Sequence, residues 1–160
     1  MNIFESTVLT KAEVTRDSEL AKTVIARGII FDMTQTAEDA VLRPRNPGAF
    51  GQGLRAALAA RVAHLAGDDT LAAHYLEDAG DYAALTDPDE TGATPWLEVI
   101  IKFVDKNANH TRDVVAEDVA ALQNEGISDA DIVRLCELVA FLAYQARVIA
   151  GLRLMQETTT

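Results

Sequence analysis

The segment from residue 128 to about residue 155 constrains the fold most strongly, because its side chains are apolar in almost every direction around a helix. Ser128 with Asp131 three residues later is typical of the first turn of a helix. A helix that is apolar all round lies at the centre of a fold or against another subunit. The sequence therefore predicts a long helix here. It also predicts a homo-oligomer that covers the apolar surface one small domain leaves open.

Shorter helices are predicted before this segment from apolar spacing and from residues that end helices. A first helix covers 17–28 and a short one covers 36–42, before Pro44 and Pro47 remove backbone donors and break the pattern. Further helices are predicted that contain the apolar residues of 54–65, 71–82 and 96–104, and another covers 116–124.

Residues that favour helix starts separate these segments. Asp68 or Asp69 is predicted to cap one helix, and Thr94 followed by Pro95 is predicted to begin the next. No stretch of useful length alternates with a period of two, so no sheet is expected. The predicted fold class is therefore all-α.

Composition limits the classes of function. The chain has 160 residues, enough for one domain, and its 49% hydrophobic content favours a packed core. Lys+Arg 14 against Asp+Glu 25 gives a net charge of −11. Such a surface repels phosphate backbones and anionic lipids, so neither nucleic acid nor membrane is an expected partner. The expected organisation is a flexible arm at 1–16, a single domain at 17–155 and a disordered tail at 156–160.

Localisation is expected to be cytoplasmic. The N-terminus has no basic segment followed by an apolar run, so no secretory signal is expected. The longest uncharged stretch near the C-terminus, 138–146, is too short to span a bilayer. The single cysteine, Cys136, forms neither an internal disulfide nor a Cys-x-x-Cys pair.

Two segments of the chain resemble parts of a known protein family. The first is 127–133 together with 138–152, where Tyr144-Gln145-Ala146-Arg147 precedes Gly151-Leu152. It is similar to the C-terminal signature of peroxidase-related members of the alkylhydroperoxidase D/carboxymuconolactone decarboxylase family. The second, 54–63 through 71–75, is similar to the helix pair that carries the redox cysteines. The resemblance implies an AhpD-like bundle of about six to seven helices. It also implies trimers or hexamers and a possible thiol-bearing partner protein.

The catalytic cysteines of the redox members are missing. Those members carry Cys-x-x-Cys and a histidine four residues beyond the second cysteine, and His74 matches that histidine. Counting back from His74, the thiol positions fall on Thr70 and Gly67, or on Leu71 and Asp68 if one residue is skipped. Thiolate attack on peroxide with a resolving cysteine therefore cannot occur at this site.

The family's proton-handling acid is also missing, because its position is occupied by Arg55 or Ala56. Only His74 remains, and it serves either as a general base or as a half-buried structural imidazole. It is the one residue predicted as catalytic.

Tyr144, Gln145 and Arg147 are polar residues within the most apolar helix. Buried polar groups need partners, so these residues either line a pocket or form a buried network at a subunit contact. In the pocket interpretation they bind substrate, with Arg147 holding the carboxylate of a small organic acid.

The remaining candidates favour structural roles. Cys136 has apolar and acidic neighbours, which disfavour a thiolate, so an inert packing role is expected. His64 and His110 lack metal-ligand spacing, and no metal or cofactor is predicted.

Three functions stay open, and the sequence does not decide whether the protein is an enzyme. The first is a non-redox oligomeric member that binds a small molecule or partners a thiol-bearing relative. The second is a cofactor-free lyase of the decarboxylase type, with His74 as acid and base and with Arg147 or Arg55 on the substrate carboxylate. The third is an alkylhydroperoxidase-like oxidoreductase that uses Cys136 alone.

Overall fold

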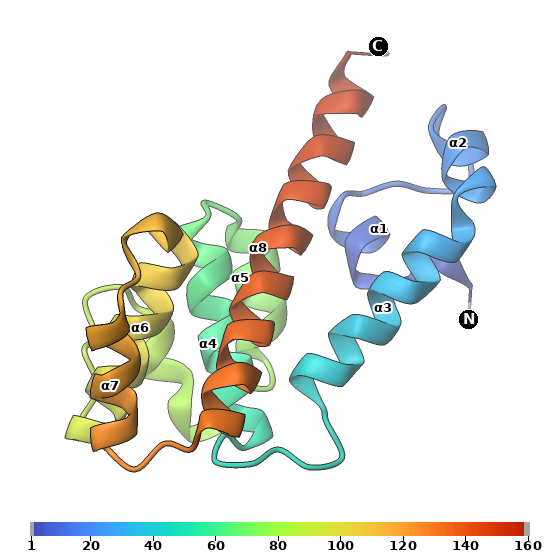
Figure 1. Cartoon of the computed structure of the whole chain (residues 1–160). Coiled ribbons are helices and arrows are strands. Elements are labelled where there is room, and N and C mark those ends of the chain that lie inside the picture. Colours follow the sequence, from blue (N-terminus) through green and yellow to red (C-terminus); the bar gives the residue numbers. More distant parts are fainter. Residues whose placement is uncertain (1, 159–160) are drawn as a thin grey trace.

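The computed structural model describes residues 2–158, and in that range it contains helices and no strand, which confirms the all-α prediction. Figure 1 shows a bundle of helices with an N-terminal extension beside one long helix. Within residues 2–158 there are eight α-helices, so the predicted count of about six to seven is not confirmed. They are α1 (Thr7–Lys11), α2 (Ala21–Ala26), α3 (Gly28–Leu42), α4 (Gln52–Leu65), α5 (Asp69–Leu76), α6 (Pro95–Asn109), α7 (Ala116–Asn124) and α8 (Asp129–Glu157), with 3-10 helices η1 (Ile3–Glu5), η2 (Gly80–Thr86) and η3 (Thr111–Asp113).

Helix α4 lies at the centre of the bundle. Every residue from Leu54 to Ala63 is buried, and the helix packs against α3, α5, η2, α6 and α8. Its many alanines let neighbouring helices approach closely, because a methyl group adds little bulk between two backbones. The central position, one of the two places expected for the last helix, is therefore held by α4.

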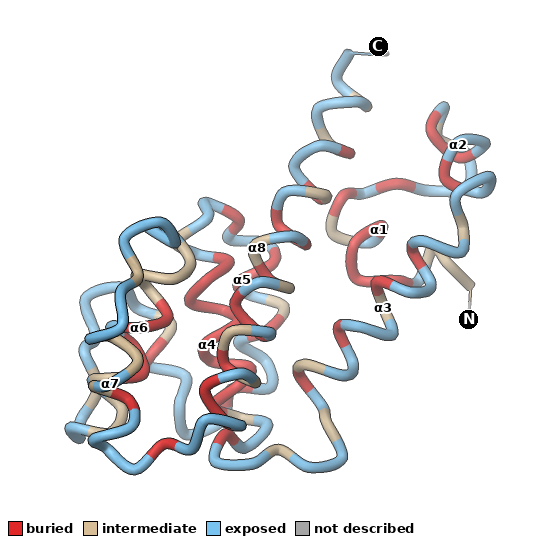
Figure 2. Tube along the Cα trace, in the orientation of Figure 1, coloured by how far each residue is buried: buried red, intermediate tan, exposed pale blue. Residues whose placement is uncertain are grey.

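Helix α8 crosses the whole molecule, and its C-terminal turns extend past the bundle in Figure 1. The predicted start is confirmed: Ser128 Oγ accepts from the Asp131 backbone N–H at 3.2 Å and donates to Asp131 Oδ2 at 2.7 Å. One face of α8 is buried, including Leu138, Leu142 and Ile149, while other positions remain exposed (Figure 2).

By length and composition alone, α8 is also the one helix in residues 2–158 that could cross a membrane. Core helices of soluble proteins share that property. In this fold the apolar face of α8 is packed on α3, α4 and α6.

Two other predicted helix starts are confirmed. Asp68 accepts from the Leu71 backbone N–H at 3.0 Å, and Thr94 Oγ1 accepts from the Leu97 N–H at 3.2 Å, with Pro95 opening α6. The helix predicted over 71–82 is shorter, because α5 ends at Leu76 and the 3-10 helix η2 follows.

The predicted helices 17–28 and 36–42 are wrong in extent. Helix α2 is short, and Gly28 begins α3 instead of ending its predecessor. The reason is spacing: Phe31, Thr34, Glu38 and Leu42 recur every three or four residues and are all buried. The intervening β-branched and polar residues hid this period in the sequence.

The segment predicted as an arm, 1–16, contains α1 in the structure. Val8 and Leu9 are buried, and the backbone is tied to the end of α8: Arg153 Nη2 donates to Lys11 O at 2.7 Å and Gln156 Nε2 donates to Ala12 O at 2.7 Å. Of the predicted tail 156–160, residues 156–157 belong to α8, and 159–160 lie outside the described residues.

Candidate functional site

His74 lies in the last turn of α5, half-buried, with its ring centroid 5.1 Å from that of Tyr75. Burial lowers the pKa of His74, and the charge of Lys11 acts in the same direction against Glu77 and Asp78. The imidazole is therefore neutral at physiological pH, the form in which it accepts a proton. The single cysteine of the chain, Cys136, is on α8.

Gln145 is fully buried and forms the centre of a polar group that joins four helices. Its Nε2 donates to Glu38 Oε2 at 2.7 Å, and its Oε1 accepts from the Tyr75 hydroxyl at 2.6 Å. Thr7 Oγ1 donates to Glu38 Oε1 at 2.8 Å. These residues, Thr7, Glu38, Tyr75 and Gln145, are called the Glu38 cluster below. The cluster is a buried network, but it lies within one chain and not at the subunit contact that the sequence interpretation named.

Glu38 is the residue of this cluster that the sequence did not single out. Its side chain is 1% exposed, and burial raises the pKa of its carboxyl against the opposing effects of Thr7, Arg43 and Gln145. Burial and the neighbouring Glu38 also raise the pKa of Tyr75. A signal was present: Glu38 lies four residues after Thr34 and four before Leu42, on the buried side of α3. Such placement of an acid indicates a buried carboxyl.

Tyr144 and Arg147 point to different neighbours. The Tyr144 hydroxyl is 3.0 Å from Thr34 Oγ1 on α3, although 42% of the residue remains exposed. Arg147 is exposed, and its Nη1 donates to the Ala143 carbonyl of its own helix at 2.8 Å.

Two depressions lie near the predicted residues. One, of about 330 Å³, lies between α4, α6 and α8; it is lined by Val62, Ala66, Ala108, Asn109, Ala143, Ala146, Arg147 and Ala150. The other, of about 210 Å³, lies beside the Glu38 cluster; it is lined by Leu42, Arg43, Gln52, Ala56, Tyr75 and Asp78. Arg147 lines the first, and the Glu38 cluster contributes Tyr75 to the second. The four predicted site residues are thus separated. Gln145 lies in the buried cluster, Tyr144 and Arg147 lie on two faces of α8, and His74 lies at the end of α5.

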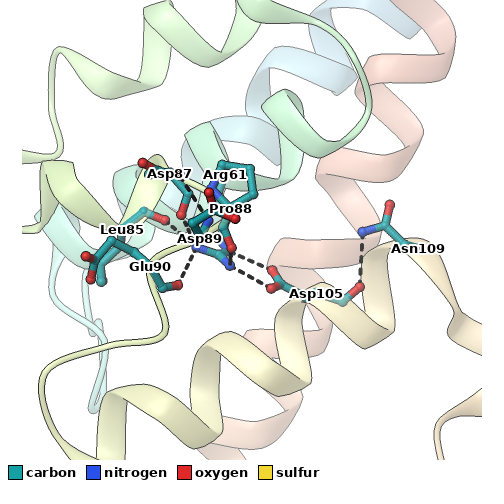
Figure 3. Close-up of polar contacts among 8 residues, drawn as sticks. All are labelled: Arg61, Leu85, Asp87, Pro88, Asp89, Glu90, Asp105 and Asn109. Atoms are coloured by element: carbon teal, nitrogen blue, oxygen red, sulfur yellow. Dashed lines mark hydrogen bonds and ion pairs between the residues drawn. The ribbon is translucent and has the colours of Figure 1, made fainter.

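Arg61 is 1% exposed and is surrounded by acceptors (Figure 3). Its Nε and Nη2 donate to the two carboxylate oxygens of Asp105, both at 2.7 Å. Its remaining donors bind the backbone carbonyl of Leu85 in η2 and those of Asp87, Pro88 and Glu90 in the loop after η2. The planar guanidinium therefore fastens this loop to α4 and α6.

Arg55 holds a second loop in the same manner. It is 2% exposed, and it donates to the carbonyls of Val41, Phe50 and Pro47 at 2.7–2.9 Å. Because these carbonyls engage Nε, Nη1 and Nη2, Arg55 is placed for a structural role and not on a substrate carboxylate.

The other candidates lie apart from these groups. Cys136 is partly buried, and burial, followed by the charge of Glu137, raises the pKa of its thiol. His64 Nδ1 lies 2.9 Å from Asp69 Oδ1 at the surface, and His110 lies 3.9 Å from Asp113. Within residues 2–158, no group of three metal-ligating side chains occurs.

Large apolar side chains are exposed on one end of the molecule. On α2 and α3, Ile25, Ile29 and Met33 are 58%, 73% and 65% exposed, and on α8 Leu154 is 61% exposed. Figure 2 shows exposed turns along the upper parts of α3 and α8, where they leave the bundle.

Comparison of the chain with protein-family models, with curated proteins and with solved structures gives no match.

Proposed function

We propose that this protein is a non-redox, oligomeric member of the alkylhydroperoxidase D/carboxymuconolactone decarboxylase type. Its role is to bind a thiol-bearing relative or a small molecule, not to reduce peroxide. The observation that carries the proposal is the exposed apolar surface of α2, α3 and α8, with Ile29 73% exposed. Soluble monomers rarely expose a contiguous apolar patch larger than a few hundred Å².

The chemistry of the thiol supports the non-redox part of the proposal. A peroxidatic cysteine works as a thiolate, which requires a lowered pKa and an electropositive setting. Cys136 has the opposite setting, because burial and Glu137 raise its pKa. His74, the residue that matches the family's histidine, is on α5, and the cysteine is on α8.

The experiment is sedimentation equilibrium of the purified chain at micromolar concentration, together with a peroxide-consumption assay in the presence of dithiothreitol. Assembly through the apolar surface predicts a mass that is a multiple of 17.3 kDa, with a trimer or hexamer favoured by the resemblance, and no peroxide turnover. Two exposed positions supply the matched variants. Ile29→Lys replaces an apolar residue of the surface with a charged one, and Lys22→Ile makes the opposite exchange at a charged position. A clean monomer, or peroxide turnover with a thiol reductant, would contradict the proposal.

A second candidate is acid–base chemistry on a small organic acid, as in the decarboxylase branch. The depression lined by Tyr75 and Arg43 favours it, because an arginine side chain can hold a carboxylate. His74 immediately precedes Tyr75 in α5, and the two ring centroids are 5.1 Å apart. A panel of small carboxylic acids tested by thermal shift should then contain a stabilising ligand, and Arg43→Gln and His74→Ala should each abolish the shift. No stabilisation across the panel would remove this candidate.

A further inference from the structure

The outer face of α8 carries a regular row of exposed residues. Their spacing alternates between three and four along the helix, which is the a/d spacing of a coiled coil. The row, called the α8 seam below, consists of Ala130, Val133, Glu137, Ala140, Tyr144, Arg147, Gly151 and Leu154, all exposed.

We infer that the α8 seam binds the α8 seam of a second copy of this chain in an antiparallel arrangement. The two-fold axis crosses the pair of helices at the height of residue 142. The inference rests on the proposed assembly and names one contact within it. A two-fold interface requires one surface to be complementary to itself, so that residue i faces j and j faces i.

Charge complementarity selects the direction of the pairing. In an antiparallel pair, a positions face d positions, and centring on residue 142 places Glu137 of one copy opposite Arg147 of the other, twice. A parallel pair would place Glu137 against Glu137 and Arg147 against Arg147. Like charges in contact oppose association, whereas opposite charges favour it. In residues 2–158 no ion pair is recorded for either side chain, and both are exposed within the single chain.

Side-chain size is complementary in the same register. A small residue faces a larger one in each of the other layers, which leaves room for helix axes to approach. These layers are Ala130 opposite Leu154, Gly151 opposite Val133, and Ala140 opposite Tyr144. The Tyr144 hydroxyl lies 3.0 Å from Thr34 Oγ1, so its ring is already positioned before a partner arrives.

The sides of the seam are apolar or small over its central turns. Phe141 and Val148 lie along one side, partly buried against the core, and Cys136 and Ala143 lie along the other. From residue 130 to residue 154 the seam is about 36 Å long at 1.5 Å per residue. Figure 1 shows the first turns of α8 in front of α4 and α5 and its C-terminal turns beyond the bundle, with no other helix drawn across it.

The test compares the wild-type chain with Glu137→Arg, Arg147→Glu and the double exchange, by sedimentation equilibrium. Each single exchange should raise the dissociation constant of the two-fold contact by about tenfold or more, because it places like charges opposite each other twice. The double exchange should restore association. Control variants are Glu117→Arg and Arg112→Glu, exposed positions outside α8 that should leave the mass unchanged. Circular dichroism checks that every variant is folded.

The outcomes separate this inference from the proposed assembly. A wild-type monomer removes both. A wild-type oligomer that both single exchanges leave intact overturns the seam, while the proposed assembly stands. Direction is checked by a spin label at Glu157→Cys in a Cys136→Ser background. The antiparallel pair predicts a separation of about 45 Å between the two labels, and a parallel pair predicts a short one.

Discussion

Arg61 and Glu38 are both buried to 1% exposure, yet the fold treats their charges differently. Arg61 has a carboxylate partner and four backbone carbonyls, so its positive charge is fully compensated. Glu38 has a hydroxyl and an amide as hydrogen-bond donors and, among residues 2–158, no ion-pair partner, and burial raises its pKa. The comparison indicates that Arg61 is a permanent anchor of the bundle, whereas Glu38 is a titratable joint between α3 and α8.

The largest expected effect is at the anchor. Arg61→Met leaves Asp105 without its ion-pair partner and the four backbone carbonyls around Arg61 without this donor. The variant should therefore destabilise the fold by about 3–5 kcal/mol. Urea unfolding followed by circular dichroism measures this. Arg112→Met, at an exposed position, is the control. A loss at Arg61 no larger than at Arg112 would refute the anchor role.

The next largest effect is at the joint. Glu38→Ala leaves Thr7 Oγ1 and Gln145 Nε2 without acceptors in a buried place, at an expected cost of about 1–3 kcal/mol. The same unfolding measurement checks it, with the exposed Asp39→Ala beside it as the matched variant. An equal stability loss in the two variants would mean that the cluster contributes nothing to the fold.

A smaller effect concerns pH. The folded chain holds the Glu38 proton more tightly than the unfolded chain does, so this group lowers stability as pH rises from the ordinary value of 4.5 toward the raised pKa. Glu38→Gln keeps the shape and has no charge to gain. The difference in unfolding free energy, variant minus wild type, should therefore increase across this window. A flat difference between pH 4 and pH 8 would show that Glu38 ionises as freely in the fold as outside it.

The smallest effect is at Cys136. Because burial and Glu137 raise the pKa of its thiol, iodoacetamide should modify the folded chain more slowly than the urea-unfolded chain at pH 8. Mass spectrometry of timed samples measures both rates. Faster modification of the folded protein than of the unfolded protein would instead support the hypothesis of an oxidoreductase that uses Cys136 alone.

Local signals in the sequence predicted helix starts well. Ser128 with Asp131, and Thr94 with Pro95, satisfy backbone donors within one turn, so a few residues suffice to recognise them. The buried charges could not be predicted in this way. The carbonyls around Arg61 come from residues 85–90, and the Glu38 partner Gln145 is 107 residues away. Those contacts depend on the packing of helices, which the apolar period alone does not specify.

The same limit applies to the candidate site. Gln145 was expected either in a pocket or in a buried network, and only the position of α3 places Glu38 beside it. The absence of a Cys-x-x-Cys pair, in contrast, can be read directly from the sequence, because one cysteine cannot make a redox pair. The exposed side of α8 also required the fold, since the sequence shows an apolar helix without showing which side α4 covers.

The most direct test of the proposed self-assembly is the mass of the wild-type chain by sedimentation equilibrium over a range of micromolar concentrations at neutral pH. The exposed surfaces of α2, α3 and α8 predict a mass of at least twice 17.3 kDa that falls on dilution. A single species of 17.3 kDa at every concentration would contradict self-assembly as the use of those surfaces.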